Sequence, residues 1–107
     1  MTEITGQLAG FIVNSRWRDI PREIRHEAKR ALLNWLGCAL GGCHDATVEI
    51  ALAAVREFAG PQQAPLVGRR ERLDVLNAAL INAIGSNVLD FDDTHLRTVI
   101  HPTVPVA

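Results

Sequence analysis

Aromatic residues are scarce in this chain of 107 residues: they make up 5% of the sequence, and tyrosine is absent. Proteins that bind single-stranded nucleic acids stack bases on aromatic side chains, and few are available here. The formal net charge of −1 also lacks the excess of basic groups that contacts to phosphate require. Composition therefore argues against nucleic acid as a partner.

Cysteine and long apolar runs are also scarce. The two cysteines, Cys38 and Cys43, are too few for a disulfide framework or for an unaided iron–sulfur cluster. We therefore expect two small, buried, reduced side chains. The N-terminus has no basic region followed by an apolar run, unlike a signal peptide, and no apolar run reaches the roughly 18 residues of a membrane span. We expect a cytoplasmic protein that does not associate with membranes.

The remaining composition is that of a globular protein, with 48% hydrophobic and 21% charged residues. Apolar residues recur every three or four positions along most of the chain, which predicts an all-α fold, an antiparallel helical bundle. A short apolar stretch with a proline is expected to form one edge strand. The predicted helices cover 4–15, 21–40, 46–59 and a segment that begins between 70 and 74 and ends near 88, and the strand lies near 64–67.

Residues that start and stop helices support these limits. Pro21 suits the first position of a helix, where its missing N–H has no cost. Gly41 and Gly42 indicate the end of that helix, and Asp45 is a suitable N-cap for the next one. Gly60 with Pro61 is expected to end the third helix.

Chemically active side chains are concentrated in one segment that follows the last predicted helix. It reads Asp90-Phe91-Asp92-Asp93-Thr94-His95, and His101-Pro102 follows six residues after His95. A carboxylate and an imidazole on one loop can act as the base and acid of a proton transfer. The same side chains are ordinary ligands for Mg²⁺, Mn²⁺ or Zn²⁺, and aspartates after a helix can also hold a loop in place. Composition and spacing leave these three interpretations open.

Three segments carry a family resemblance: Ile20-Pro21-Arg22-Glu23 leading to 31–42, Asn77-Ala78-Ala79-Leu80-Ile81-Asn82-Ala83, and the Asp90–His95 segment with His101-Pro102. Together they resemble the 2-methylcitrate dehydratase (MmgE/PrpD) family, and the resemblance spans essentially the whole chain. The family is mostly helical, with a separate smaller lid domain, and its members are usually homodimers. Its activities include dehydration of 2-methylcitrate in propionate metabolism, decarboxylation of cis-aconitate and epimerisation of iminodisuccinate, all without a metal or organic cofactor.

The resemblance implies site residues. Asp90, Thr94 and His101 fall on family positions that line the pocket, so they are the expected catalytic residues. We expect binding of a small polycarboxylate substrate by three further residues: Asp93, His95 and Asn87. Many relatives have a histidine at the position of Asn87, and an amide cannot transfer a proton as an imidazole can. The resemblance implies no metal and no cofactor.

Family members are several times longer than this chain. We therefore expect residues 1–107 to form a single, incomplete helical domain, the N-terminal part of a larger lyase, and to be inactive alone. The basic groups that complete the family's site are absent, and the nearest lysine, Lys29, lies on a charged face. Two alternatives are a non-catalytic helical interaction module and a metal-dependent hydrolase or lyase. The latter would use Asp90, Asp92, Asp93, His95 and His101.

Overall fold

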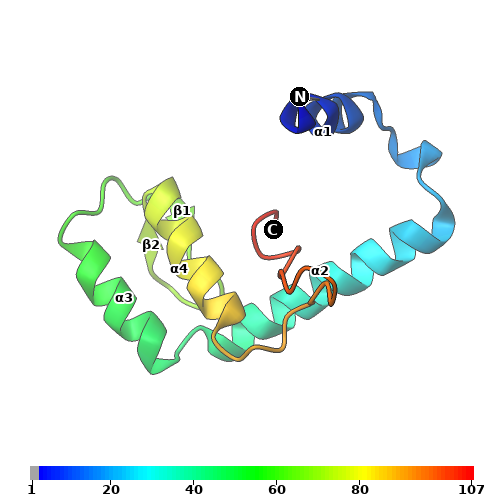
Figure 1. Ribbon diagram of the computed structural model, residues 1–107. Helices are drawn as coiled ribbons and strands as arrows, with labels where there is room; N and C mark the ends of the chain where they lie inside the picture. Colours follow the sequence, from blue (N-terminus) through cyan, green and yellow to red (C-terminus); the bar gives the residue numbers. More distant parts are fainter. Residues whose placement is uncertain (1–2) are drawn as a thin grey trace.

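The computed structural model describes residues 3–107, and its architecture is mostly helical (Figure 1). The prediction of an all-α fold with one short strand is confirmed, and that strand pairs with a second one. The elements in chain order are α1 (Ile4–Asn14), the 3-10 helix η1 (Trp17–Asp19), α2 (Arg22–Gly42), α3 (Ala46–Arg56), β1 (Ala64–Pro65), β2 (Arg72–Leu73) and α4 (Val75–Asn87).

Helix limits differ from the predictions by a few residues at several ends. Pro21 has an extended backbone and is the N-cap of α2, so it precedes the first helical residue instead of occupying it. Helix α3 ends at Arg56, ahead of the predicted Gly60-Pro61 stop. Strand β2 was not predicted; its two residues pair antiparallel with β1, with Ala64 opposite Leu73. Two-residue strands contain too little sequence to show the alternation that identifies a strand.

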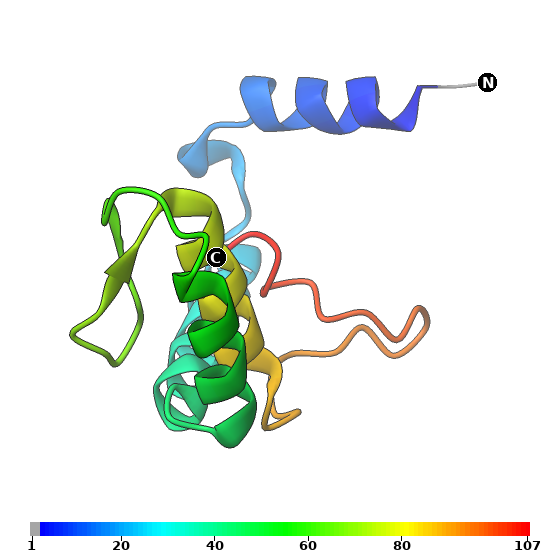
Figure 2. The same cartoon turned by 90° about the vertical axis from the view of Figure 1, so that its left-hand side faces the viewer.

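Helix α4 is the centre of the core and packs against both α2 and α3. Figures 1 and 2 show α4 beside α3, with the β1–β2 hairpin next to them and the C-terminal half of α2 across the end of α4. Small residues of α2, Cys38, Ala39 and Gly42, form its buried face. The main apolar cluster comprises Val48, Leu52, Leu66, Leu73, Ala78 and Ile81.

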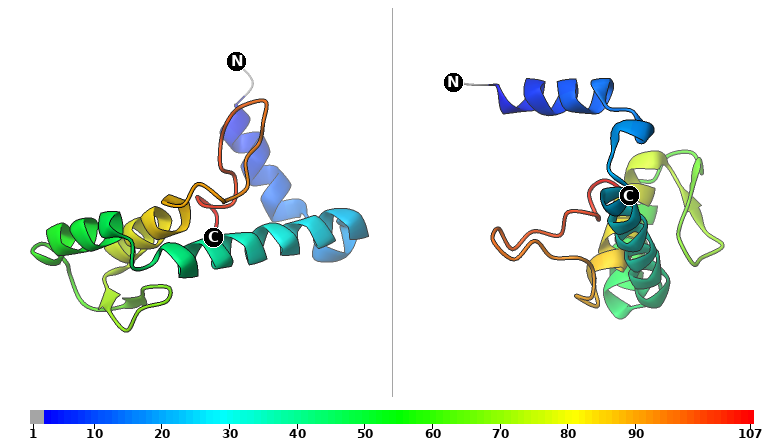
Figure 3. Two further views of the ribbon diagram at one scale, coloured as in Figure 1. Left: turned by 90° about the horizontal axis from the view of Figure 1, so that it is seen from below. Right: turned by 90° about the vertical axis from the view of Figure 1, so that its right-hand side faces the viewer.

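Helix α1 differs from α2, α3 and α4 because none of its residues is buried. Figure 3 shows α1 apart from α3, α4 and the C-terminal half of α2; η1 joins it to the N-terminal end of α2. Large apolar side chains of α1, such as Phe11 and Ile12, are 68% and 70% exposed. Within residues 3–107, no single helix has the length and apolarity for a membrane crossing; α2 and α3 meet that measure only as a pair bent by 80°.

Two aspartates cap the core helices, and we expect them to differ in importance. The Asp45 carboxylate accepts from Thr47 N at 2.8 Å, as predicted for an N-cap. Asp74 accepts from the backbone and side chain of Asn77 and also from Gly60 N at 3.0 Å, so it joins α4 to the middle of the α3–β1 connection. Hydrogen bonds from Asn77 lower the pKa of Asp74.

In urea denaturation, Asp45→Ala should cost about 1 kcal/mol, the usual effect of losing a cap, and Asp74→Ala should cost more. Because the pKa of Asp74 is lower in the folded state, its contribution is complete above the unfolded pKa and is lost as the pH falls. The difference between the two variants should therefore shrink in acid. Equal losses at neutral pH would contradict the linking role of Asp74.

Candidate functional site

The segment with the predicted site residues begins with a tight turn at the end of α4. Asp90 has a φ of 54°, in the left-handed region that aspartate tolerates better than most residues. Its N–H donates to Asn87 O at 2.8 Å, and the turn reverses the chain toward α2. There the Asn34 side chain donates to Phe91 O at 3.1 Å. The site is thus anchored to both α4 and α2.

Asp92 is the most buried charged group of the segment. Its side chain has no exposed surface, although the neighbouring segment is open to solvent. The Asn87 amide donates to both carboxylate oxygens, at 3.2 and 3.3 Å. Because a buried carboxylate is unfavourable without partners, these contacts explain how the fold accommodates it.

His101 lies between two carboxylates. Its Nδ1 is 3.0 Å from Asp92 Oδ2, and its Nε2 is 3.8 Å from Asp90 Oδ1. The Thr94 hydroxyl is 3.5 Å from the same Nδ1. The structure therefore brings Asp90, Thr94 and His101 together. Asp92 also belongs to this group. The spacing of the three nearby aspartates did not show which of them is buried.

Asp93 and His95 make contacts within the loop instead of joining this group. Asp93 accepts from the backbone N–H and the hydroxyl of Thr103, at 3.3 and 2.7 Å. His95 Nδ1 lies 2.7 Å from the Thr98 hydroxyl, and its backbone pairs with Ile100. These contacts fit the third interpretation of the sequence, in which polar residues hold a loop in place.

Asp90, Asp92 and His101 also form a group with the chemistry of a metal site. One ligand atom from each lies within 4.8 Å of the others. Two carboxylate oxygens and one imidazole nitrogen suit Mn²⁺ or Zn²⁺. Of the five ligands in the metal hypothesis, Asp93 and His95 are outside this group.

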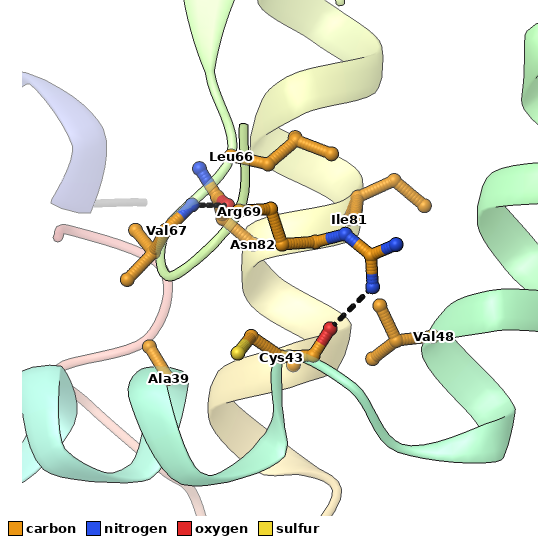
Figure 4. Close-up of a pocket in the computed structure, with 9 residues that line it drawn as sticks. Ala39, Cys43, Val48, Leu66, Val67, Arg69, Ile81 and Asn82 are labelled. Carbon is orange, nitrogen blue, oxygen red and sulfur yellow. Dashed lines mark hydrogen bonds between the residues drawn. The ribbon is translucent and has the colours of Figure 1, made fainter. Parts of the chain in front are cut away.

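The cavity in Figure 4 lies elsewhere, between α2, α3, α4 and the β1–β2 hairpin. Arg69 donates across it to Cys43 O at 2.7 Å, and Asn82 accepts from Val67 N at 2.9 Å. Its volume of about 10 Å³ holds roughly one water molecule, so a polycarboxylate cannot enter it. This cavity belongs to the core packing.

Both cysteines are free and buried, as expected. Burial raises the pKa of the Cys38 thiol, and the negative charges of Asp92 and Asp93 raise it further. A thiol with a raised pKa is a poor nucleophile, because the thiolate is the reactive form. Cys38 is therefore a packing residue beside the site.

These features define a class: a helical domain that presents a carboxylate–imidazole group on a loop after its central helix. The model of the MmgE/PrpD N-terminal domain matches residues 6–107, and the chain belongs to this family. It is 26% identical over 98 residues to the cis-aconitate decarboxylase-like protein oryM of Aspergillus oryzae and 24% identical over 98 residues to the cis-aconitate decarboxylase of Aspergillus terreus.

Each of these alignments covers 92% of the chain. The chain spans about a fifth of the length of these curated relatives, because the matched part is 20% of each. No solved structure shows significant similarity to the chain. The comparisons therefore establish the family and its association with lyase-type relatives.

Proposed function

We propose that this chain contributes one loop of the active site of a lyase that acts on small di- or tricarboxylic acids, with dehydration of 2-methylcitrate as the reaction. The observation that carries the proposal is the position of His101 between Asp90 and Asp92, beside Thr94, in a chain of the MmgE/PrpD family. The names of the relatives make decarboxylation of cis-aconitate the main alternative to this dehydration.

The proposed dehydration removes a proton from the carbon next to a substrate carboxylate. The electron pair of that C–H bond forms the C=C bond, and the hydroxyl on the neighbouring carbon accepts a proton and leaves as water. An imidazole exchanges protons near neutral pH, so His101 and the exposed Asp90 are the groups that take up and return the proton. The Thr94 hydroxyl can donate a hydrogen bond to a substrate carboxylate or hydroxyl. These roles use the groups that the loop brings together.

The charge of the loop indicates what else this reaction needs. Asp90, Asp92 and Asp93 are acidic, and the ion pairs of the described residues give this group no lysine or arginine partner. Removal of the proton builds negative charge on the substrate, and that charge needs hydrogen-bond donors or cations. We propose that a segment outside this chain supplies them, as expected if the protein is longer.

A chimera tests this function directly. Residues 6–107 would replace the matched segment of the Aspergillus terreus cis-aconitate decarboxylase, and consumption of cis-aconitate and 2-methylcitrate would be followed by proton NMR. We expect the chimera to turn over one of them and the 107-residue chain alone to turn over neither. His101→Gln and Asp90→Asn should each lower kcat by about 10²-fold or more.

His44→Gln is the matched control, because His44 is exposed and pairs with Glu49 away from the site. It should leave kcat unchanged. A chimera that unfolds cooperatively yet converts neither acid would contradict the proposal. So would equal effects of His101→Gln and His44→Gln.

A second candidate is a metal-dependent hydrolase or lyase, which the grouping of Asp90, Asp92 and His101 within 4.8 Å favours. Calorimetric titration of the chelator-treated chain with Mn²⁺ and Zn²⁺ distinguishes the two. One equivalent of tightly bound metal, lost in Asp90→Asn, would favour this candidate. Absence of binding would favour the metal-independent lyase.

A further inference from the structure

We propose that Asp92 and Asn87 are positioning residues that hold His101 in the Nδ1–H form, so that Nε2 is the nitrogen available for proton transfer. The inference rests on the proposed function for the role of Nε2, whereas the tautomer itself follows from the contacts. It assigns the two ring nitrogens different tasks, one structural and one chemical.

The first argument is the close approach of Nδ1 to Asp92. An imidazole nitrogen with a free lone pair would be repelled by a carboxylate oxygen at 3.0 Å. A proton on Nδ1 turns the same approach into an electrostatic attraction, and the Thr94 hydroxyl, which donates to Asp92 O at 3.4 Å, can accept from this Nδ1–H at 3.5 Å. Since both oxygens of Asp92 already accept from Asn87, this carboxylate presents lone pairs to its neighbours.

The second argument is the difference in burial between the two carboxylates. The Asp92 side chain has no exposed surface, whereas that of Asp90 is 85% exposed. Contacts to Asn87 hold the buried carboxylate in place, whereas the Asp90 carboxylate lies open to solvent. The histidine side chain, 27% exposed, therefore has one fixed side and one side open to solvent.

The third argument concerns Asn87, the last residue of α4. Its amide donates to Asp92 and, unlike an imidazole, does not change its protonation state in the accessible pH range. The negative charge of Asp92 is thus directed at His101 and is not shared with a second titratable group at position 87. Asn87 acts on the histidine through Asp92.

The experiment is ¹⁵N NMR of the histidine side chains in the 107-residue chain at alkaline pH, where imidazole is neutral. His101→Gln identifies the His101 signals among those of the four histidines. We expect the neutral His101 to favour the Nδ1–H form by about tenfold, from the attraction to Asp92 together with the hydrogen bond to the Thr94 hydroxyl. Asp92→Ala should reverse that preference, and Asn87→Ala should weaken it.

Asp93→Asn is the matched control, because it removes a charge from the adjacent residue, which contacts Thr103 and not His101. It should leave the tautomer of His101 unchanged. An Nε2–H form in the unaltered chain would overturn the proposal, and this measurement needs no variant other than His101→Gln for the assignment. An unchanged tautomer in folded Asp92→Ala would overturn it as well.

The ¹⁵N measurement of the tautomer does not involve turnover, so it tests the positioning role separately from the proposed lyase activity. An Nδ1–H form with an inactive chimera would contradict the lyase and leave the positioning role in place. An Nε2–H form with an active chimera would contradict only the positioning role.

Discussion

Gly42→Ala is expected to destabilise the protein by about 3 kcal/mol or more, because it forces apart the helices that carry the site. A Cβ on Gly42 would overlap the carbonyl oxygen of Gly85 and would lie 2.6 Å from Val88 Cγ1. The overlap with Gly85 is with backbone, which cannot move aside as a flexible side chain can. Helix α4 would have to shift away from α2.

The control for this prediction is Gly37→Ala in the same helix. Apart from its own stretch of helix, no atom lies within 4 Å of a Cβ at Gly37, so the substitution should stabilise the protein by about 0.5–1 kcal/mol through helix propensity. Urea denaturation followed by circular dichroism measures both variants. Changes of the same sign would show that helix propensity, and not the α2–α4 contact, dominates at Gly42.

Arg69→Met is expected to cost about 2–4 kcal/mol, because Arg69 joins the α2–α3 turn to the β1–β2 hairpin. Only 6% of its side chain is exposed, and it donates to Cys43 O and to the carboxylates of Glu49 and Glu71. Methionine keeps much of the apolar stem but leaves the Cys43 carbonyl without its donor. Thermal and urea unfolding of both proteins would measure the loss.

The pH dependence gives this prediction a specific signature. Hydrogen bonds from Arg69 lower the pKa of Glu71 from 4.5 to about 2, and they also lower the pKa of Glu49. A lowered carboxyl pKa stabilises the fold fully above the unfolded value and loses that effect as the pH falls toward 2. The unaltered protein should therefore lose stability between about pH 4.5 and 2.

Arg69→Met should show a flatter dependence in that interval, because Glu49 then has no guanidinium partner and Glu71 keeps only the exposed Arg56. Arg56→Met is the matched control: Arg56 contacts Glu71 at 3.1 Å, but its side chain is 53% exposed, so the loss should be about 0–1 kcal/mol. A loss as large as that of Arg69→Met would show that burial of Arg69 has no special importance.

Predictions from the sequence were most successful where the pattern is local. The 3.6-residue spacing placed α2, α3 and α4 within a few residues, and the N-cap at Asp45 is confirmed by its hydrogen bond to Thr47. The sequence also predicted a strand near 64–67 but not its partner, Arg72–Leu73. A two-residue strand is defined by pairing with another strand several residues away, so its own residues do not identify it.

Within the loop, the sequence identified the chemical groups but not their arrangement. Asp90, Asp92 and Asp93 are close in sequence, yet their surroundings differ. Asp90 is exposed, Asp92 is buried against His101, and Asp93 accepts hydrogen bonds from Thr103. The left-handed turn at Asp90 and the Asn87 amide decide this distribution. Neither can be read from spacing alone.

The sequence by itself determined the helical class, the limits of the main helices and the family to which the chain belongs, because helix periodicity, caps and motif order are properties of neighbouring residues. Tertiary structure alone decided which aspartate faces His101 and that Gly42 must lack a side chain beside Gly85. The requirement at Gly42 arises where α2 and α4 cross, because the crossing brings Gly42 against Gly85, 43 positions further along the chain. The choice of aspartate depends on the turn at Asp90 and on the Asn87 amide, whose geometry is a property of the folded loop and not of residue spacing.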